Sequence, residues 1–173
     1  MIAGRFEKLG YVGAAIKARD NETAQTVLLV DVRNLDPRFT GVFHPALLSI
    51  FAIVEDHGRT LAAAEFVHAR TLAETFGGQS CHPRRAAEIV AELADGLAEL
   101  HARQLTHGNI TASSTVLTAK GKAKLTLTSA SGGTEQADLR ALKTLFVSIG
   151  GKLTPDSAGA ASAATFAALL RSG

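Results

Sequence analysis

The chain has 173 residues, of which 46% are hydrophobic and 20% are charged, so its composition is that of a folded globular protein and not of a disordered segment. The formal net charge is only +2 and the lysines and arginines do not cluster, which argues against nucleic-acid binding. The only cysteine, Cys81, excludes an internal disulfide, and the first residues are too polar for a signal peptide, so a cytoplasmic location is expected. The longest apolar run, ALLSIFAIV, is far shorter than the ~20 residues of a membrane-spanning helix, so no membrane insertion of this segment is expected.

The first part of the chain is predicted to form strands. A loose alternation in residues 5–20 and a β-branched run in residues 26–32 flank a polar turn at Asn21–Thr23, which predicts a hairpin. Residues 34–45 contain two prolines and a glycine and are predicted to be mostly loop. Two further apolar runs follow, so about five strands are expected before residue 68.

After residue 68 the apolar spacing becomes helical. Residues 83–101 predict a long helix, with Ser80 as the candidate cap and Pro83 in the first turn. The pattern also predicts, in chain order, a short helix over residues 71–76, a hairpin around Lys120–Gly121, a helix ended by Gly150 and Gly151, and a last helix that begins at Thr154. The sequence therefore predicts an α+β fold with a β-rich part, residues 1–68, and a helical part, residues 69–173, within one domain.

The common catalytic and ligand-binding motifs are missing. The six histidines and Cys81 have no spacing typical of metal ligands, and GGKLT at residues 150–154 lacks the spacing of a phosphate-binding loop. No Gly-x-Ser-x-Gly motif is present. Neither a metal nor a cofactor is therefore expected.

The order of the segments resembles the protein kinase family, especially the bacterial Ser/Thr kinases, over roughly residues 4–150. The stretches that carry this resemblance are RFEKLGYVGAAIKARD (the glycine-loop strands), QTVLLVDV (the strand of the kinase lysine), HPALLSIFAIVEDHG (the two strands after it), LAAAEFVHARTLAETF (the hinge, with Glu65 and Phe66), AAEIVAELADGLAELHARQLTHGN (the long helix that leads into the catalytic loop) and ADLRALKTLF (the helix that supports this loop). The resemblance implies a two-lobed kinase-like fold. Hardly any chain lies between Ser129 and Ala137, which implies a truncated version without an activation segment.

The positions to which the resemblance assigns kinase chemistry have residues without that chemistry. The phosphate-binding lysine falls at Val30, the catalytic base at Asn109, the loop lysine at Thr111, and the two metal ligands at Ser114 and Leu127. Phosphoryl transfer needs Mg²⁺ and cationic side chains against the phosphates, and a neutral amide cannot replace a carboxylate base. The resemblance therefore implies an inactive enzyme that does not bind ATP.

Two positions with structural roles in the kinase family are retained. His107 stands at the start of the catalytic-loop segment, LTHGNITASSTVLT, where the family has a histidine that packs within the core. Asp138 matches an aspartate that accepts backbone N–H groups of that loop. The sequence therefore predicts that the shape of the loop is kept without its chemistry.

The resemblance predicts a catalytically inactive pseudokinase domain that acts as a protein–protein interaction, scaffolding or regulatory module in bacterial signalling. The expected partner is another protein or protein domain, or a second copy of the chain. The last predicted helix places Phe166, Leu169 and Leu170 on one face, which either caps the chain's own helices or contacts another subunit.

Three alternatives stay open. The first is a phosphotransfer enzyme with an atypical mechanism, although the one acidic residue beside a key position, Asp31, is directed to the opposite face of its strand from Val30. The second is a nucleotide-binding switch without turnover. The third is a small α+β domain that only shares the order of elements with kinases.

Overall fold

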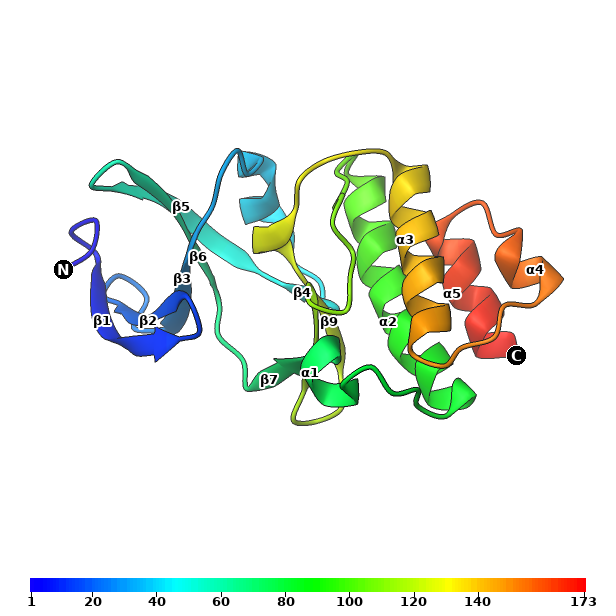
Figure 1. Cartoon of the computed structure of the whole chain (residues 1–173). Helices are drawn as coiled ribbons and strands as arrows, with labels where there is room; N and C mark the ends of the chain where they lie inside the picture. The colour runs from blue at the N-terminus through cyan, green and yellow to red at the C-terminus, as the bar shows by residue number, and fades with distance from the viewer.

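The computed structural model describes all residues from Met1 to Gly173 and has an α+β fold in which most strand pairs are antiparallel. The first sheet has the strand order β1-β2-β3-β6-β5, and every neighbouring pair in it is antiparallel. In Figure 1 this sheet lies at the left and the helices lie at the right. The strands of this sheet are β1 (Phe6–Val12), β2 (Ala15–Asp20), β3 (Thr26–Asp31), β5 (Ile50–Asp56) and β6 (Arg59–Glu65).

The rest of the chain forms a second sheet, with the order β4-β9-β8-β7, and the helices. The strands are β4 (Leu47–Leu48), β7 (Ala69–Thr71), β8 (Thr115–Thr118) and β9 (Ala123–Thr126). The helices are α1 (Leu72–Phe76), α2 (Pro83–Ala102), α3 (Glu135–Ser148), α4 (Pro155–Ala158) and α5 (Ala163–Ser172), with two 3₁₀ helices, η1 (Pro37–Gly41) and η2 (Leu127–Ser129). Because β4 pairs in parallel with β9, a segment that precedes residue 68 belongs to the second sheet.

The hairpin of β2 and β3 depends on Asp20, whose side chain is only 2% exposed. Its carboxylate accepts hydrogen bonds from the guanidinium of Arg5 at 2.8 and 2.6 Å, from the Glu22 N–H at 3.0 Å and from the Thr23 hydroxyl at 2.9 Å. The Arg5 hydrogen bonds are the main reason why the pKa of Asp20 lies far below its usual range. The polar turn that the sequence predicts is therefore confirmed, and an ion pair to Arg5, the residue before β1, reinforces it.

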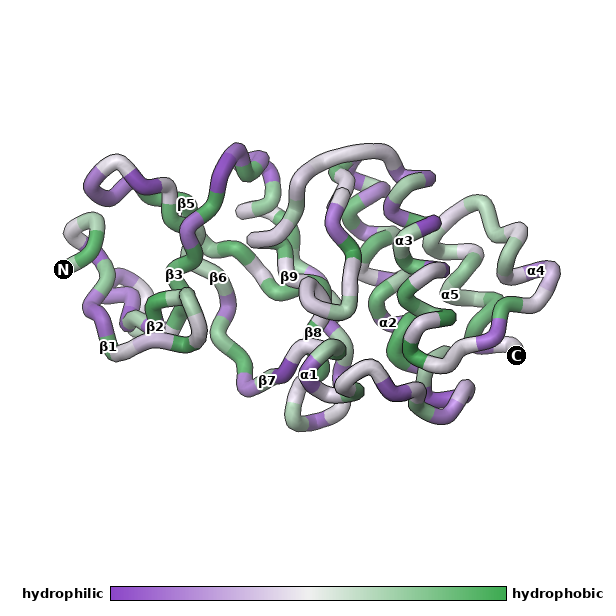
Figure 2. The backbone as a smooth tube through the Cα atoms, in the orientation of Figure 1, coloured by the Kyte–Doolittle hydropathy of each residue, from purple (hydrophilic) through white to green (hydrophobic).

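The main hydrophobic core is centred on α2. Four of its side chains (Ile89, Leu93, Leu97 and Leu100) are fully buried, at the helical spacing that the sequence predicts. In Figure 2 hydrophobic and hydrophilic residues alternate along α2, as expected for a helix with one buried face. Gly96 allows β4 to pack closely against α2, because a Cβ at this position would lie only 3.0 Å from the Leu47 side chain. The resulting cluster contains 30 buried residues and joins both sheets to the helices.

A second, smaller core lies within the first sheet. It contains Phe6, Ala18, Val27, Leu29 and Ala63, which project from four neighbouring strands. Alternation along each strand directs these residues to one face. The five strands predicted before residue 68 (β1, β2, β3, β5 and β6), α1, α2, α3 and the two predicted hairpins are confirmed, whereas the separate strand β4 and the strand β7 were not predicted.

No helix of the chain has both the length and the hydropathy needed to cross a membrane.

The predicted cap of the long helix is wrong. His82 and not Ser80 precedes the first turn, and its Nδ1 accepts the backbone N–H of Arg84 at 3.2 Å. Ser80 lies two residues too early for this role, because a cap side chain reaches only the second or third N–H of the helix. The prediction of Pro83 in the first turn is confirmed.

The prediction of one last helix from Thr154 is also wrong, because α4 and α5 are separate helices. Thr154 and Ser157 cap α4 reciprocally, and the helix ends at Gly159. Ser162 then begins α5, since its hydroxyl accepts the backbone N–H of Thr165 at 3.1 Å. The alanine-rich sequence concealed both the end of α4 at Gly159 and the start of α5 at Ser162.

On the last helix, two of the three residues of the predicted apolar face are buried within the chain. Phe166 is fully buried and Leu170 is 8% exposed, because α5 packs along α2. The Phe166 ring meets the edge of Phe146 with 6.0 Å between the ring centroids. Only Leu169 is partly exposed. Through Phe166 and Leu170, this face therefore caps the core of the chain.

Candidate functional site

The loop Leu105–Ser114 connects α2 to β8 and is held by the buried carboxylate of Asp138, in the first turn of α3. Asp138 Oδ2 accepts the backbone N–H of His107 at 2.8 Å, and Oδ1 accepts that of Gly108 at 2.7 Å. His101, at the end of α2, places its Nε2 3.0 Å from Oδ2. Burial alone would raise the pKa of Asp138, but the hydrogen bonds from His101, Gly108 and His107 outweigh it and keep the pKa below its usual value.

His107 is fully buried and ties the loop to β9. Its Nδ1 accepts the backbone N–H of Asn109 at 3.1 Å, so Nε2 carries the proton and donates to the carbonyl of Thr126 at 2.8 Å. Burial lowers the pKa of His107, which favours this neutral ring. Both ring nitrogens are therefore used to hold the backbone, and neither is free to move a proton.

Residues 129–133 lie directly against the loop. Ser131 donates its backbone N–H to the His107 carbonyl at 2.8 Å and its hydroxyl to the Gly108 carbonyl at 3.0 Å. Gly108 has φ of +76°, and a Cβ at this position would lie 1.5 Å from the carbonyl oxygen of Gly132. Only glycine fits here, both for its conformation and for the close approach of the second segment.

Three of the positions singled out from the sequence lie in this one loop and bond to one another. Ser114 Oγ donates to the Asn109 carbonyl at 2.6 Å and accepts the backbone N–H of Thr111 at 2.8 Å. The Asn109 side-chain amide donates to the carbonyl of Ser129 at 3.2 Å. Ser114 is buried, while Asn109 and Thr111 are exposed. Their polar groups stabilise the loop itself.

The other two positions belong to the hydrophobic core. Leu127 is 1% exposed, and Val30, on β3, is partly buried against the same cluster. Asp31, next to Val30, is exposed at the end of β3. The structure therefore brings Asn109, Thr111 and Ser114 together but gives Val30 and Leu127 packing roles.

Two lysines that the sequence analysis did not single out lie at the connection between the sheets. Lys124, on β9, places its Nζ 3.8 Å from Glu65 Oε1, and Lys17, on β2, places its Nζ 4.5 Å from the centroid of the Phe66 ring. The other carboxylate oxygen of Glu65 accepts the backbone N–H of Ser49 at 3.1 Å. Alternation along β9 could have identified Lys124, since it lies between the buried Ala123 and Leu125.

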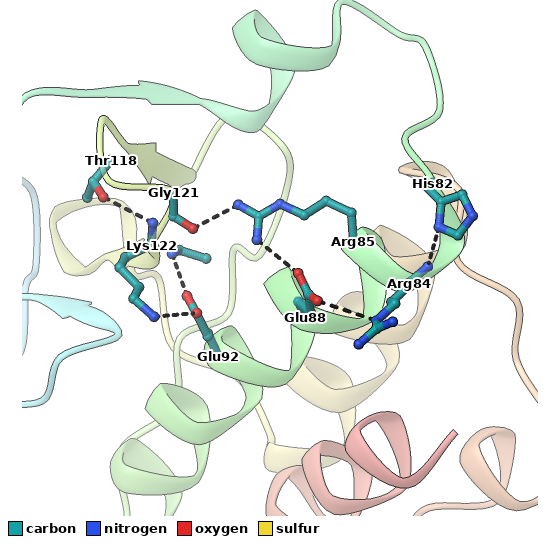
Figure 3. Close-up of polar contacts among 9 residues, drawn as sticks. His82, Arg84, Arg85, Glu88, Glu92, Thr118, Gly121 and Lys122 are labelled. Atoms are coloured by element: carbon teal, nitrogen blue, oxygen red, sulfur yellow. Dashed lines mark hydrogen bonds and ion pairs between the residues drawn. The ribbon is translucent and has the colours of Figure 1, made fainter.

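A second polar cluster joins α2 to the turn between β8 and β9, as Figure 3 shows. Arg85 donates to the carbonyl of Gly121 at 2.8 Å. Glu92 accepts the backbone N–H of Ala123 at 2.7 Å and lies 3.4 Å from Lys122 Nζ. Each of these contacts links residues far apart in the chain, so local sequence patterns could not have predicted them.

Two cavities have a notable size. The smaller one, about 250 Å³, lies between η1 and the start of the loop Leu105–Ser114. The larger one, about 700 Å³, lies between α2, α5 and residues 152–157. Neither is lined by Val30, Asn109, Ser114 or Leu127. The loop and the larger of these two cavities are thus separate candidate sites.

No model of a protein family matches the sequence, and no curated protein matches it.

Proposed function

We propose that this chain is a kinase-like module that does not transfer phosphate and that acts by binding another protein. The order of its elements supports this proposal: a five-stranded antiparallel sheet, a short connection, a long helix, a loop, a hairpin and a further helix. The same order underlies the resemblance of the sequence to bacterial Ser/Thr kinases. The function of a fold is decided by its sites, so the proposal depends mainly on the loop.

One observation carries the proposal: the key side chains in and around the loop Leu105–Ser114 form hydrogen bonds within the chain and so hold the loop in place. Asp138 accepts three hydrogen bonds from the loop and from His101, and both nitrogens of His107 bond to the backbone. Asn109 and Ser114 also bond within this region. None of these groups is a carboxylate placed to accept a proton from a substrate hydroxyl.

The residues at the other key positions do not fit a magnesium nucleotide. Mg²⁺ prefers carboxylate oxygens, and Leu127 offers none because its side chain is apolar and buried. Val30 offers no cation to a phosphate. A triphosphate at this place would meet apolar side chains and would lose its hydration without compensation. Phosphoryl transfer at these positions would therefore have neither a metal ligand nor a cation to support it.

A thermal-shift titration tests the proposal. A nucleotide that binds with micromolar affinity stabilises a protein by about 4 kcal/mol at millimolar concentration, which raises the Tm of a chain of this size by roughly 10 °C. We expect no rise with ATP, whether or not Mg²⁺ is present. An active protein kinase in the same plate is the positive control. A clear rise that depends on Mg²⁺, together with transfer of labelled phosphate, contradicts the proposal.

A nucleotide-binding switch is the second candidate, and the placement of two lysines favours it. Lys17 from the first sheet and Lys124 from the second both reach the Glu65–Phe66 connection, so two ammonium groups flank the junction of the sheets. For this candidate, ATP raises the Tm without Mg²⁺ and without turnover. Lys17→Ala then abolishes the rise, whereas Arg33→Ala, an exposed cation outside this junction, leaves it unchanged.

A further inference from the structure

The larger of the two cavities is a groove between α2 and α5, which we call the α2–α5 groove. It has a volume of about 700 Å³, within the range of ligand sites in proteins. α2 forms one wall, and α5 with residues 152–157 forms the other. Its lining includes Arg84, Ala87, Glu88, Glu92, Lys152 and Leu169.

The floor of the groove is apolar and shallow on the α2 side. Ala87 and Ala91 are four residues apart, so they lie on the same face of α2 one turn from each other. Ala91 is only 1% exposed, so the accessible part of this floor is the methyl group of the partly exposed Ala87, over which another helix can approach α2 closely. Leu169 on α5 is partly exposed opposite them. This shape suits a helix that lies along α2.

The acidic groups of the groove are already paired within the chain. Glu88 lies 3.2 Å from the Arg85 guanidinium, and Glu92 accepts the Ala123 N–H at 2.7 Å and lies 3.4 Å from Lys122 Nζ (Figure 3). These contacts tie both carboxylates to α2 and the hairpin. They leave little negative charge to attract a basic partner.

The basic groups of the groove are largely unpaired. Lys152 is exposed and has no ion pair within the chain. The Arg84 side chain is 86% exposed and its only ion pair, with Glu88, is long at 3.8 Å. One of these cations lies on each wall of the groove. Their unmatched charge complements carboxylates on an occupant.

We propose that the α2–α5 groove binds a short acidic amphipathic helix of a partner protein. The apolar stripe of that helix lies on Ala87 and Leu169, and its flanking carboxylates face Arg84 and Lys152. This inference names the partner surface of the proposed protein-binding function and rests on it. The nucleotide titration does not involve this groove, so each of the two can fail without the other.

Fluorescence anisotropy with designed peptides tests the inference on the full chain. The probe is a labelled helical peptide of about four turns with a leucine stripe and glutamates on both flanks. A peptide with lysines in place of the glutamates is its matched counterpart. We expect the acidic peptide to bind at least about tenfold more tightly than the basic one.

Two variants locate the binding in the groove. Lys152→Glu reverses an unpaired charge on the wall and should weaken the acidic peptide about tenfold, whereas Arg33→Glu, the same reversal outside the groove, should not. Ala87→Trp fills the partly exposed floor and should abolish binding, with circular dichroism to verify that the chain is folded. The inference is overturned if neither peptide binds, if both bind equally, or if Lys152→Glu leaves the affinity unchanged.

Discussion

The loop Leu105–Ser114 and the α2–α5 groove both adjoin α2, but they use their polar groups in opposite ways. In the loop, the buried Asp138 and His107 bond to backbone groups of the same chain. In the groove, Lys152 and Arg84 direct their charges outward. Polar groups that are paired and buried stabilise a fold, whereas unpaired charges beside an apolar floor can recognise a partner. The region that resembles a catalytic loop is thus the structural one.

Removal of the Asp138 carboxylate gives the largest expected effect. Asp138→Ala leaves the His107 and Gly108 N–H groups buried without an acceptor, which should lower the free energy of unfolding by about 3 kcal/mol. Urea denaturation measures this loss. Asp138→Asn keeps one acceptor oxygen and should lose less.

Lys152→Glu is the change in the α2–α5 groove that corresponds to Asp138→Ala beside the loop. Since Lys152 is exposed and unpaired, the free energy of unfolding should change by less than about 0.5 kcal/mol. If Asp138→Ala and Lys152→Glu cost the same, the distinction between a structural loop and an outward-facing groove is wrong.

The Gly108 variant tests how tightly residues 129–133 hold the loop. Gly108→Ala adds a Cβ that would lie 1.5 Å from the Gly132 carbonyl oxygen, so one of the two segments must move. Gly58 is the matched control, because it has the same φ of +76° and nothing within 4 Å of an added Cβ. We expect Gly58→Ala to cost about 1 kcal/mol for its conformation alone, and Gly108→Ala to cost about 2 kcal/mol more. Equal losses of unfolding free energy would mean that the two segments separate easily.

Much of the fold could be predicted from local sequence patterns, because the buried residues of α2 recur at helical spacing and those of the strands alternate. The break between α4 and α5 could not, since the alanine-rich sequence around Gly159 has helical spacing throughout and only the Ser162 cap marks the second start. The contacts of the candidate site were harder to predict from the sequence than the fold. The contact of Asp138 with the loop was expected only from the resemblance to kinases. The pairs Lys124–Glu65 and Lys17–Phe66 join distant segments, which periodicity does not reveal.

A pH dependence of the free energy of unfolding is expected from His107. Burial lowers the pKa of this residue in the folded chain, while in the unfolded chain it titrates near its ordinary value of about 6.5. Between these two pKa values the unfolded chain binds a proton that the folded chain does not. The stabilising effect of the neutral ring is therefore complete above about pH 6.5 and is lost as the pH falls toward the lower pKa of the folded state.

The slope of this loss is at most about 1.4 kcal/mol per pH unit, since a single proton is involved. Unfolding free energies from urea titrations between pH 7 and pH 5 measure it, and the difference between the wild type and His107→Gln isolates the contribution of His107 from that of the other acids and bases. We expect the wild type to lose more stability over this range than the variant, even though the variant is less stable at pH 7. Parallel curves would show that His107 is protonated as easily in the folded chain as in the unfolded one, and the loop would then be open to water and not the closed, structural element that its hydrogen bonds describe.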